Sequence, residues 1–250
     1  MYNLLISLGV GIAIALGIKQ AGFSLWAGLI PGTLAFAFTF ILLARRVAKR
    51  IQALMDSVQK EFATQATNQK EAQQKVERAV KTLEQGLVYD KWQIMVGPEL
   101  HAQIGMLKYM VKDLDGAQAH FAKAGPRNYM AKAMEGALHY QRKNFTAMEA
   151  AFEAAVKTGK KESVIWAAYA WCLVQNKEKD KALRVLARAV ETNPSDEKLK
   201  SSLTQLQNDK RLKMKPYEPT WWQFGLEAPP MPTMGGGGGG GRRVQFINRR

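Results

Sequence analysis

The chain has 250 residues, a formal net charge of +15 and 47% hydrophobic residues. That length holds one or two domains. The basic balance suits nucleic acid, anionic lipid or an acidic protein and does not choose among them. The single cysteine, Cys172, excludes an internal disulfide and a multi-cysteine zinc site, and its apolar neighbours favour a buried, inert thiol over a nucleophile.

Residues 1–45 predict a transmembrane helical hairpin. The apolar run Leu4–Ile18 ends at Lys19, and a second run, Ala21–Ala44, carries no charge. At ~1.5 Å per residue the second run can cross roughly 30 Å of hydrocarbon. Glycines in both runs permit close helix approach. Two alternatives stay open for the first run: a secretory signal peptide, which its missing basic n-region disfavours, and a re-entrant helix beside one true span.

The charges around the hairpin predict its orientation. Four basic residues follow the second run directly: Arg45, Arg46, Lys49 and Arg50. Only Lys19 stands in the turn, so the basic end is expected in the cytoplasm, and Trp26 is expected to anchor the outer end at the membrane interface. We therefore expect an integral membrane protein, in a bacterial inner membrane, with the rest of the chain cytoplasmic.

Residues 46–96 predict a long connecting helix. Between residues 45 and 87 there is no proline, and Gly86 is the one glycine. Apolar residues recur at three-four spacing in a narrow stripe, at Val47, Ile51, Leu54, Val58, Phe62, Ala72, Val76, Val80, Leu83 and Leu87. Such a stripe is typical of a weak coiled coil or a solvated stalk. It is interpreted either as a spacer or as a surface for homo-oligomer formation.

Residues 97–209 contain an internal repeat. Three positions of one helix recur at offsets of 31 and then 34 residues: Ala117, Phe121 and Ala124; Met148, Phe152 and Ala155; Ala182, Leu186 and Ala189. Twelve residues before each set stands a small residue: Gly105, Gly136 and Ala170. Proline and glycine divide the segment into helix pairs at 99–112 with 116–124, 130–142 with 146–157, and 162–175 with 179–192. A last helix, 196–209 with Ser195 as N-cap, is expected to cover the open end of the stack.

The third unit resembles the tetratricopeptide repeat family, because six of its residues stand at the spacings of that motif: Trp166, Ala170, Ala182, Leu186, Ala189 and Pro194. The second unit departs from the motif, since Met148 stands where a small residue is usual. The resemblance implies an all-α solenoid of antiparallel helix pairs that binds proteins, and it implies no chemistry.

The resemblance also implies that the first helix of each pair lines a concave groove. The positions carried over are Ala102, Met106 and Tyr109, then Ala133, Ala137 and Tyr140, then Ala167, Trp171 and Val174. The candidate partner-binding residues are Met106, Tyr109, Tyr140, Trp171 and Val174, which suit an apolar helix or an extended peptide. The alternative is that some of these rings pack between units. The basic clamp that the family uses for acidic chaperone tails is absent, since its positions carry Ala102, Met106, Met134, Val164 and Ala168.

Residues 210–250 form a basic, aromatic tail rich in proline and glycine. Its first half carries Trp221, Trp222 and Phe224 behind a lysine-rich run, and these rings are expected to fold back on the last helix or groove, or to contact a lipid surface. Nucleic acid is the least favoured partner. A run of seven glycines predicts a flexible linker, and Arg242, Arg243 and Phe246 follow it as a linear motif or a solubilising end.

The sequence carries no catalytic signature of the metalloprotease, phosphate-loop, hydrolase or dinucleotide-binding classes. His101, His120 and His139 are interpreted as ordinary helix residues. We therefore expect an adaptor with no enzymatic activity and no cofactor, tethered to a membrane and bound to a protein or peptide partner. Two other functions remain as alternatives: a structural subunit of a membrane complex held by its hairpin, and a membrane tether for nucleic acid or anionic lipid.

Overall fold

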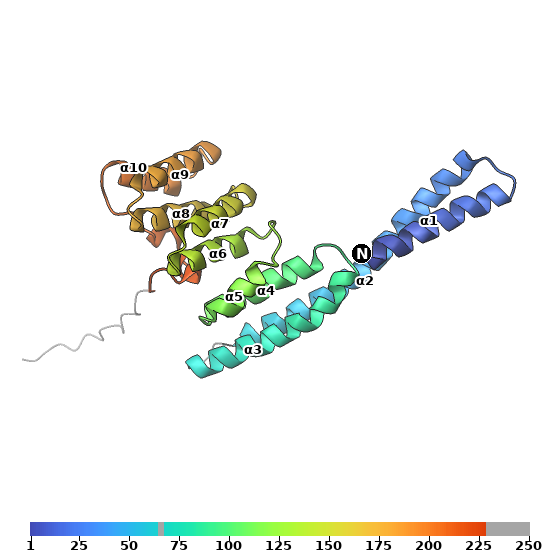
Figure 1. The fold of residues 1–250 in the computed structure, drawn as a ribbon, viewed down its shortest axis with the longest axis horizontal. Coiled ribbons are helices and arrows are strands. Elements are labelled where there is room, and N and C mark those ends of the chain that lie inside the picture. The colour runs from blue at the N-terminus through green and yellow to red at the C-terminus, as the bar shows by residue number, and fades with distance from the viewer. Residues whose placement is uncertain (65–67, 229–250) are drawn as a thin grey trace, which may run out of the picture.

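The computed structural model describes residues 1–64 and 68–228, and all the regular structure in these residues is helical (Figure 1). The α-helices are α1 Tyr2–Gln20, α2 Leu25–Phe62, α3 Gln69–Gly86, α4 Val96–Met110, α5 Leu114–Phe121, α6 Tyr129–Gln141, α7 Phe145–Thr158, α8 Ser163–Gln175, α9 Lys179–Thr192 and α10 Glu197–Gln207. Three short 3₁₀ helices, η1 Leu87–Lys91, η2 Lys215–Tyr217 and η3 Thr220–Phe224, complete the set. The prediction of an all-α chain with a repeat array is confirmed.

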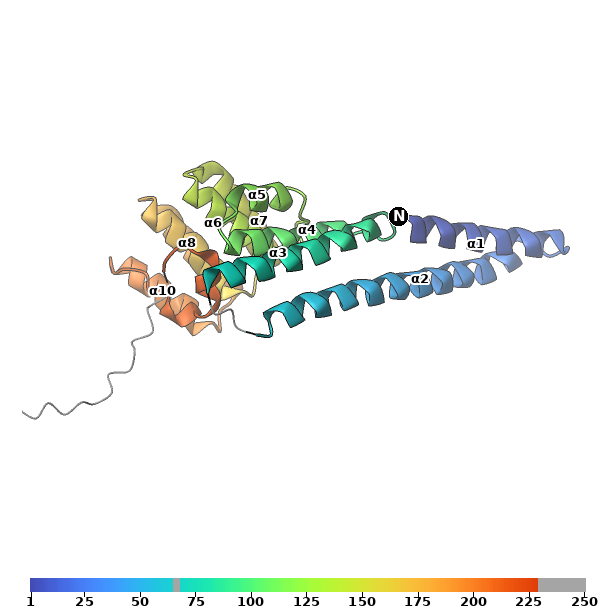
Figure 2. The same cartoon turned by 90° about the horizontal axis from the view of Figure 1, so that it is seen from below.

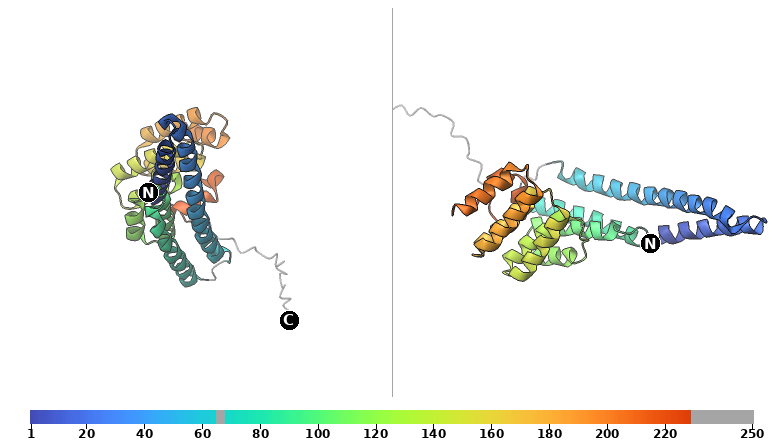
Figure 3. Two further views of the ribbon diagram at one scale, coloured as in Figure 1. Left: turned by 90° about the vertical axis from the view of Figure 1, so that its right-hand side faces the viewer. Right: turned by 90° about the horizontal axis from the view of Figure 1, so that it is seen from above.

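Helices α1 and α2 form an antiparallel hairpin that projects away from the repeat array (Figure 3). Both helices are long and apolar enough to cross a membrane, as judged by length and composition. Their backbones touch at glycines. A Cβ built on Gly11 would lie 2.7 Å from the carbonyl oxygen of Gly32, and one on Gly28 would lie 2.7 Å from that of Ala15. The hairpin therefore depends on residues without side chains at this crossing.

The single connecting helix expected from residue 45 to 87 is corrected by the structure. Helix α2 does continue past the basic cluster, but it ends at Phe62, and α3 runs back beside it toward the hairpin (Figure 2). Asn68 caps the start of α3 by accepting a hydrogen bond from the Glu71 amide at 2.8 Å. The helical periodicity of the stripe is the same whether the helix is straight or folded in two, so the spacing alone could not reveal the reversal.

The two halves of the stripe bury each other and the first repeat helix. Val76, Val80 and Leu83 of α3 form a cluster with Leu100 and Ile104 of α4. Partly buried residues of α2, Ile51, Met55 and Val58, close this cluster from the other side. Burial of such side chains stabilises by roughly 1.5–3 kcal/mol each, so the stripe joins the hairpin to the array within one chain.

The repeat array pairs α4 with α5, α6 with α7 and α8 with α9, and α10 packs on α8 and α9. Within the first two pairs, the small residue of one helix receives the phenylalanine of the next. A Cβ on Gly105 would lie 2.7 Å from Phe121, and one on Gly136 would lie 2.7 Å from Phe152. This contact explains why those two columns of the repeat keep their spacing.

The turns inside the pairs repeat a feature that the sequence interpretation missed. Lys112, Lys143 and Lys177 have left-handed backbones, with φ of 67°, 58° and 63°. The residue after each lysine is the N-cap of the next helix, and Asp113 and Asn144 accept hydrogen bonds there from backbone amides. A lysine followed by an acid or amide at offsets of 31 and 34 residues was the signal available for these turns.

Both ends of the array are covered. Leu199 and Leu206 of α10 are buried against the last pair, as expected for a capping helix. Asp196, one residue after the expected Ser195, is the N-cap of α10 and accepts hydrogen bonds from the Lys198 and Leu199 amides. At the other end, α3 lies on α4 and covers the first pair.

Replacing Gly32 by valine should separate α1 from α2, because the new Cβ would lie 2.7 Å from the Gly11 carbonyl oxygen. Cysteines introduced at Leu8 and Phe36, which line the same cleft of the hairpin, would report the separation as a lower yield of cross-link with a short bismaleimide. Gly9→Val is the matched control, since nothing lies within 4 Å of a Cβ there. Equal cross-linking in both variants would refute glycine-mediated packing.

Replacing Leu83 by alanine should weaken the junction of α2, α3 and α4. Leu83 is 1% exposed, and truncation of a buried leucine costs about 2–5 kcal/mol. Hydrogen–deuterium exchange of the α3 amides in the full chain would show the loss of protection. Val88→Ala, at a 68% exposed position, should change protection by no more than about 0.5 kcal/mol. Protection of α3 that survives Leu83→Ala would mean that another contact holds the reversal.

Candidate partner-binding groove

The first helices of the pairs, α4, α6 and α8, place small residues on one side of the array. Ala102, Ala133, Ala137 and Ala167 are fully buried there. The five candidate partner-binding residues differ in exposure. Tyr109 and Trp171 are buried, and Met106, Tyr140 and Val174 are half-buried. The structure thus brings the three predicted rings to one side of the array.

The chain's own tail lies on this side. After α10 the chain turns back, and η3 packs against α6 and α8, where Figure 1 draws it in orange-red. Five large side chains of residues 210–228 are buried: Leu212, Met214, Tyr217, Trp221 and Phe224. Trp222 is half-buried. Of the readings left open for these aromatics, folding back into the groove is the one that the structure displays.

Two hydrogen bonds fix the tail to the groove, and a third, between two groove residues, positions the phenol that makes the first. The Tyr109 hydroxyl donates to the Phe224 carbonyl oxygen at 2.5 Å. Gln141 Nε2 donates to the Tyr109 hydroxyl at 2.8 Å and to the Gly225 carbonyl oxygen at 3.3 Å. Burial raises the pKa of Tyr109 well above its usual range, so the phenol keeps the proton that it donates. Gly225 has a φ of 56°, the left-handed backbone that favours glycine at the end of η3.

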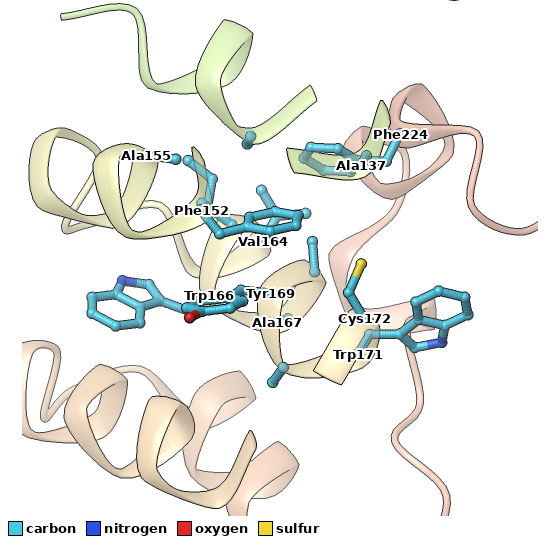
Figure 4. Close-up of a cluster of buried hydrophobic side chains, with 14 of the residues drawn as sticks. Ala137, Phe152, Ala155, Val164, Trp166, Ala167, Tyr169, Trp171, Cys172 and Phe224 are labelled. Carbon is cyan, nitrogen blue, oxygen red and sulfur yellow. The ribbon is translucent and has the colours of Figure 1, made fainter. Parts of the chain in front are cut away.

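Ring contacts continue the seam. Trp171 meets Trp221 edge to face at 5.3 Å between ring centroids, and it meets Tyr140 at 5.7 Å in the same geometry. Trp221 in turn lies 6.1 Å from Phe224. In Figure 4, Trp171 and Trp166 leave α8 on opposite sides, so only the first faces the tail. Aromatic pairs of this kind add ~0.5–1.5 kcal/mol each beyond area burial.

Two further contacts involve residues that were not singled out from the sequence, one between α10 and the tail and one within the tail. Ser202 of α10 and the Tyr217 hydroxyl are 2.8 Å apart, and Trp221 Nε1 donates to a Glu227 carboxylate oxygen at 3.1 Å. Burial raises the pKa of Tyr217 to about 12. Serine and glutamate are common on helix surfaces and loops, so no spacing signal could have marked them.

The three histidines and the cysteine are the side chains that could carry chemistry, and their surroundings are those of structural residues. His101 and His120 lie on paired helices, with their Nδ1 atoms 3.0 Å apart, and burial lowers the pKa of both. Burial likewise lowers the pKa of His139. Cys172 is fully buried, which raises the pKa of its thiol far above the range of a nucleophile. Within residues 1–64 and 68–228, no group of three or more His, Cys, Asp or Glu residues could hold a metal ion.

The candidate membrane-interface residues are all exposed. Trp26 is 79% exposed near the start of α2, and the four basic residues Arg45, Arg46, Lys49 and Arg50 are exposed where α2 leaves its apolar half. Arg242, Arg243 and Phe246 lie outside the described residues.

Comparison with known proteins agrees with the architecture. Residues 139–206, which run from α6 to α10, match the family model described as tetratricopeptide repeat. No curated protein matches the chain. Repeats of this family are protein-interaction modules rather than catalysts. Residues 139–206 are therefore similar to tetratricopeptide repeats, within an all-helical fold whose groove carries the chain's own tail.

Proposed function

We propose that this protein is a membrane-anchored scaffold whose repeat array binds a protein or peptide partner at the cytoplasmic face of a bacterial inner membrane. The length and apolar surface of α1 and α2 support the anchor. The excess of basic residues at one end of the hairpin supports the orientation. Anchoring raises the effective concentration of a bound partner near the membrane.

The observation that carries the proposal is the peptide already seated on the groove. Residues 217–225 make contacts of the kind that the groove was expected to offer, with the Trp221 ring against Trp171 and the Phe224 carbonyl oxygen on the Tyr109 hydroxyl. The groove therefore suits an aromatic segment folded as a short 3₁₀ helix. A partner of that chemistry would bind Met106, Tyr109, Tyr140, Trp171 and Val174 by taking the place of the tail.

The tail then acts as an internal competitor. Because it is attached to α10, its effective concentration at the groove is in the range of ~1 mM or more. The apparent affinity for a partner is the intrinsic affinity multiplied by the fraction of molecules in which the groove is open. Loosening the tail should raise partner binding, and damaging the groove should lower it. These opposite signs make the proposal testable.

The structural-subunit alternative also has a specific observation in its favour. The hairpin bears an apolar cleft of about 250 Å³ along Leu8, Ile12, Leu29 and Phe36, which another transmembrane helix could fill. In that case the spans, and not the groove, would hold the protein in a complex. Replacing residues 1–45 by an unrelated hairpin separates the two functions.

The seating of the tail can be tested without a partner. Trp221→Ala with Phe224→Ala removes two fully buried rings, each worth ~3–5 kcal/mol of packing. Hydrogen exchange of the Tyr217, Trp222 and Gly225 amides should accelerate by at least about a hundredfold, while α8 stays protected. Gln223→Ala, an exposed neighbour, should leave exchange unchanged. If all variants exchange alike, the rings do not hold the tail.

Partner capture can be measured by quantitative cross-linking mass spectrometry on membranes that contain the full chain. Trp171→Ala with Tyr140→Ala should reduce the cross-linked partner by about tenfold or more, since aromatic anchors dominate such interfaces. Trp221→Ala with Phe224→Ala should increase it.

The matched control for the groove variant is Trp166→Ala. It removes a similarly buried tryptophan from the other side of the same helix, where the ring contacts Arg188 at 5.6 Å. Capture that falls equally with Trp166→Ala would indicate loss of stability instead of loss of the groove. Capture that survives both groove changes but fails with a foreign hairpin would favour the structural-subunit function.

A further inference from the structure

A cavity of about 310 Å³ lies at the junction of the hairpin and the array, outside the groove. It is lined by Asn3 of α1, by Leu43, Arg46, Val47 and Arg50 of α2, and by Tyr89 and Trp92 at η1. In Figure 2 the start of α1 meets the end of the α3–η1 segment at this point. The Asn3 backbone N–H donates to the Trp92 carbonyl oxygen at 3.2 Å, which joins the two segments directly.

Asn3 is the first sign that the cavity takes a ligand. It is 1% exposed, and neither its Oδ1 nor its Nδ2 has a hydrogen-bond partner among the described residues. Ser7 occupies only the backbone carbonyl oxygen of Asn3, at 2.7 Å. Buried side-chain amides in native proteins are almost always paired, because an unpaired buried group loses its hydrogen bonds to water and gains none in exchange. An asparagine that lines a cavity and has both side-chain polar atoms unpaired therefore indicates that the cavity binds a ligand with hydrogen-bonding atoms.

The charged residues around the cavity indicate the sign of the ligand's charge. Arg46 and Arg50 stand one turn apart on α2, so both face the cavity that they line. Neither pairs with a carboxylate in the described part of the chain, and the lining contains no acidic residue. The N-terminal end of α1 adds partial positive charge nearby. Guanidinium groups bind the oxygens of phosphates with two parallel hydrogen bonds, and the Asn3 amide can donate to a third oxygen.

The surroundings indicate what the phosphate is attached to. Leu43 marks the end of the apolar half of α2, and Val47 is buried beside it. Trp92 meets Tyr2 edge to face at 5.5 Å. Val88 and Ile94, on either side of this tryptophan, are 68% and 54% exposed. Aromatic rings beside exposed aliphatic residues are typical of segments at the membrane interface. A ligand here would have its charged group among arginines and its apolar part along α2.

We propose that this cavity is a binding site for the phosphate group of an anionic phospholipid, held by Arg46, Arg50 and Asn3. The inference rests on the proposed membrane anchoring, and it goes beyond it by naming a lipid class and a site. Bound lipid would tie α1, α2 and η1 together, so that the array keeps a fixed position above the membrane surface. A soluble phosphate shares this chemistry and is separated from the lipid by the experiment.

The test uses the full chain in nanodiscs of phosphatidylcholine, with and without phosphatidylglycerol, and native mass spectrometry of the lipids that remain bound. The wild type should retain phosphatidylglycerol selectively. Arg46→Gln with Arg50→Gln should lower the affinity about tenfold further than Arg45→Gln with Lys49→Gln. The second pair removes the same charge from the same segment but does not line the cavity. Equal losses in the two pairs would overturn the site in favour of diffuse attraction to the surface.

Asn3 supplies a test without a change in arginine charge. Asn3→Leu keeps the volume of the side chain and should lower the affinity for phosphatidylglycerol about fivefold, while raising the melting temperature in pure phosphatidylcholine, where the amide would be unpaired. Asn3→Asp keeps the shape, adds a negative charge, and should lower retention further. Unchanged retention in either variant would overturn the proposal. Displacement of phosphatidylglycerol by millimolar inorganic phosphate would overturn the lipid as occupant, and no displacement is the expected result.

Resistance to carbonate extraction separates the inference from the function on which it rests. Extraction of the wild type from membranes would defeat the proposed anchoring itself. Resistance of every variant to extraction, together with equal lipid retention in the two charge-matched pairs, would defeat only the lipid site.

Discussion

The structure depends on the contact that turns α3 back along α2. The apolar stripe continues along α2 beyond the hairpin, and Val76, Val80 and Leu83 of α3 pack against it. Leu100 and Ile104 then extend the same cluster into the first repeat helix. Because the three helices share one small core, the array is held beside the end of the hairpin by packing and not only by the chain. The cavity at Asn3 exists because this reversal brings η1 to the start of α1.

The reversal accounts for one of two surfaces that the sequence offers to partners and that the chain uses internally. The stripe was a candidate surface for homo-oligomer formation, yet its residues from α2 and α3 contact one another and α4. The groove was a candidate surface for a peptide, and the tail lies on it through Trp221 and Phe224. A basic chain with this much apolar surface lowers its exposed apolar area by such contacts. Its partners must then compete with the chain itself or use other faces.

The parts of the fold that sequence could predict are those that local contacts determine. The repeat register follows from Gly105 against Phe121 and from Gly136 against Phe152, which are contacts within one helix pair. The hairpin follows from two long apolar runs. By contrast, no proline or glycine marks the reversal that follows Phe62. Its cause is burial against α4, a segment distant in sequence. Long-range packing of this kind has no periodic signature.

The sites divide in the same way. Tyr109, Tyr140 and Trp171 could be placed on one side by the repeat alone, whereas their occupant could not, because Trp221 reaches them only through the turn after α10. In the sequence, Asn3 stands at the edge of an apolar run, where a single amide residue is what the end of a helix commonly carries. Its role can be inferred only from the structure, in which Trp92 and the arginines of α2 line the same cavity. A buried, unpaired amide between two segments distant in sequence is therefore stronger evidence of a ligand than the basic cluster, which by charge alone suits any anionic surface.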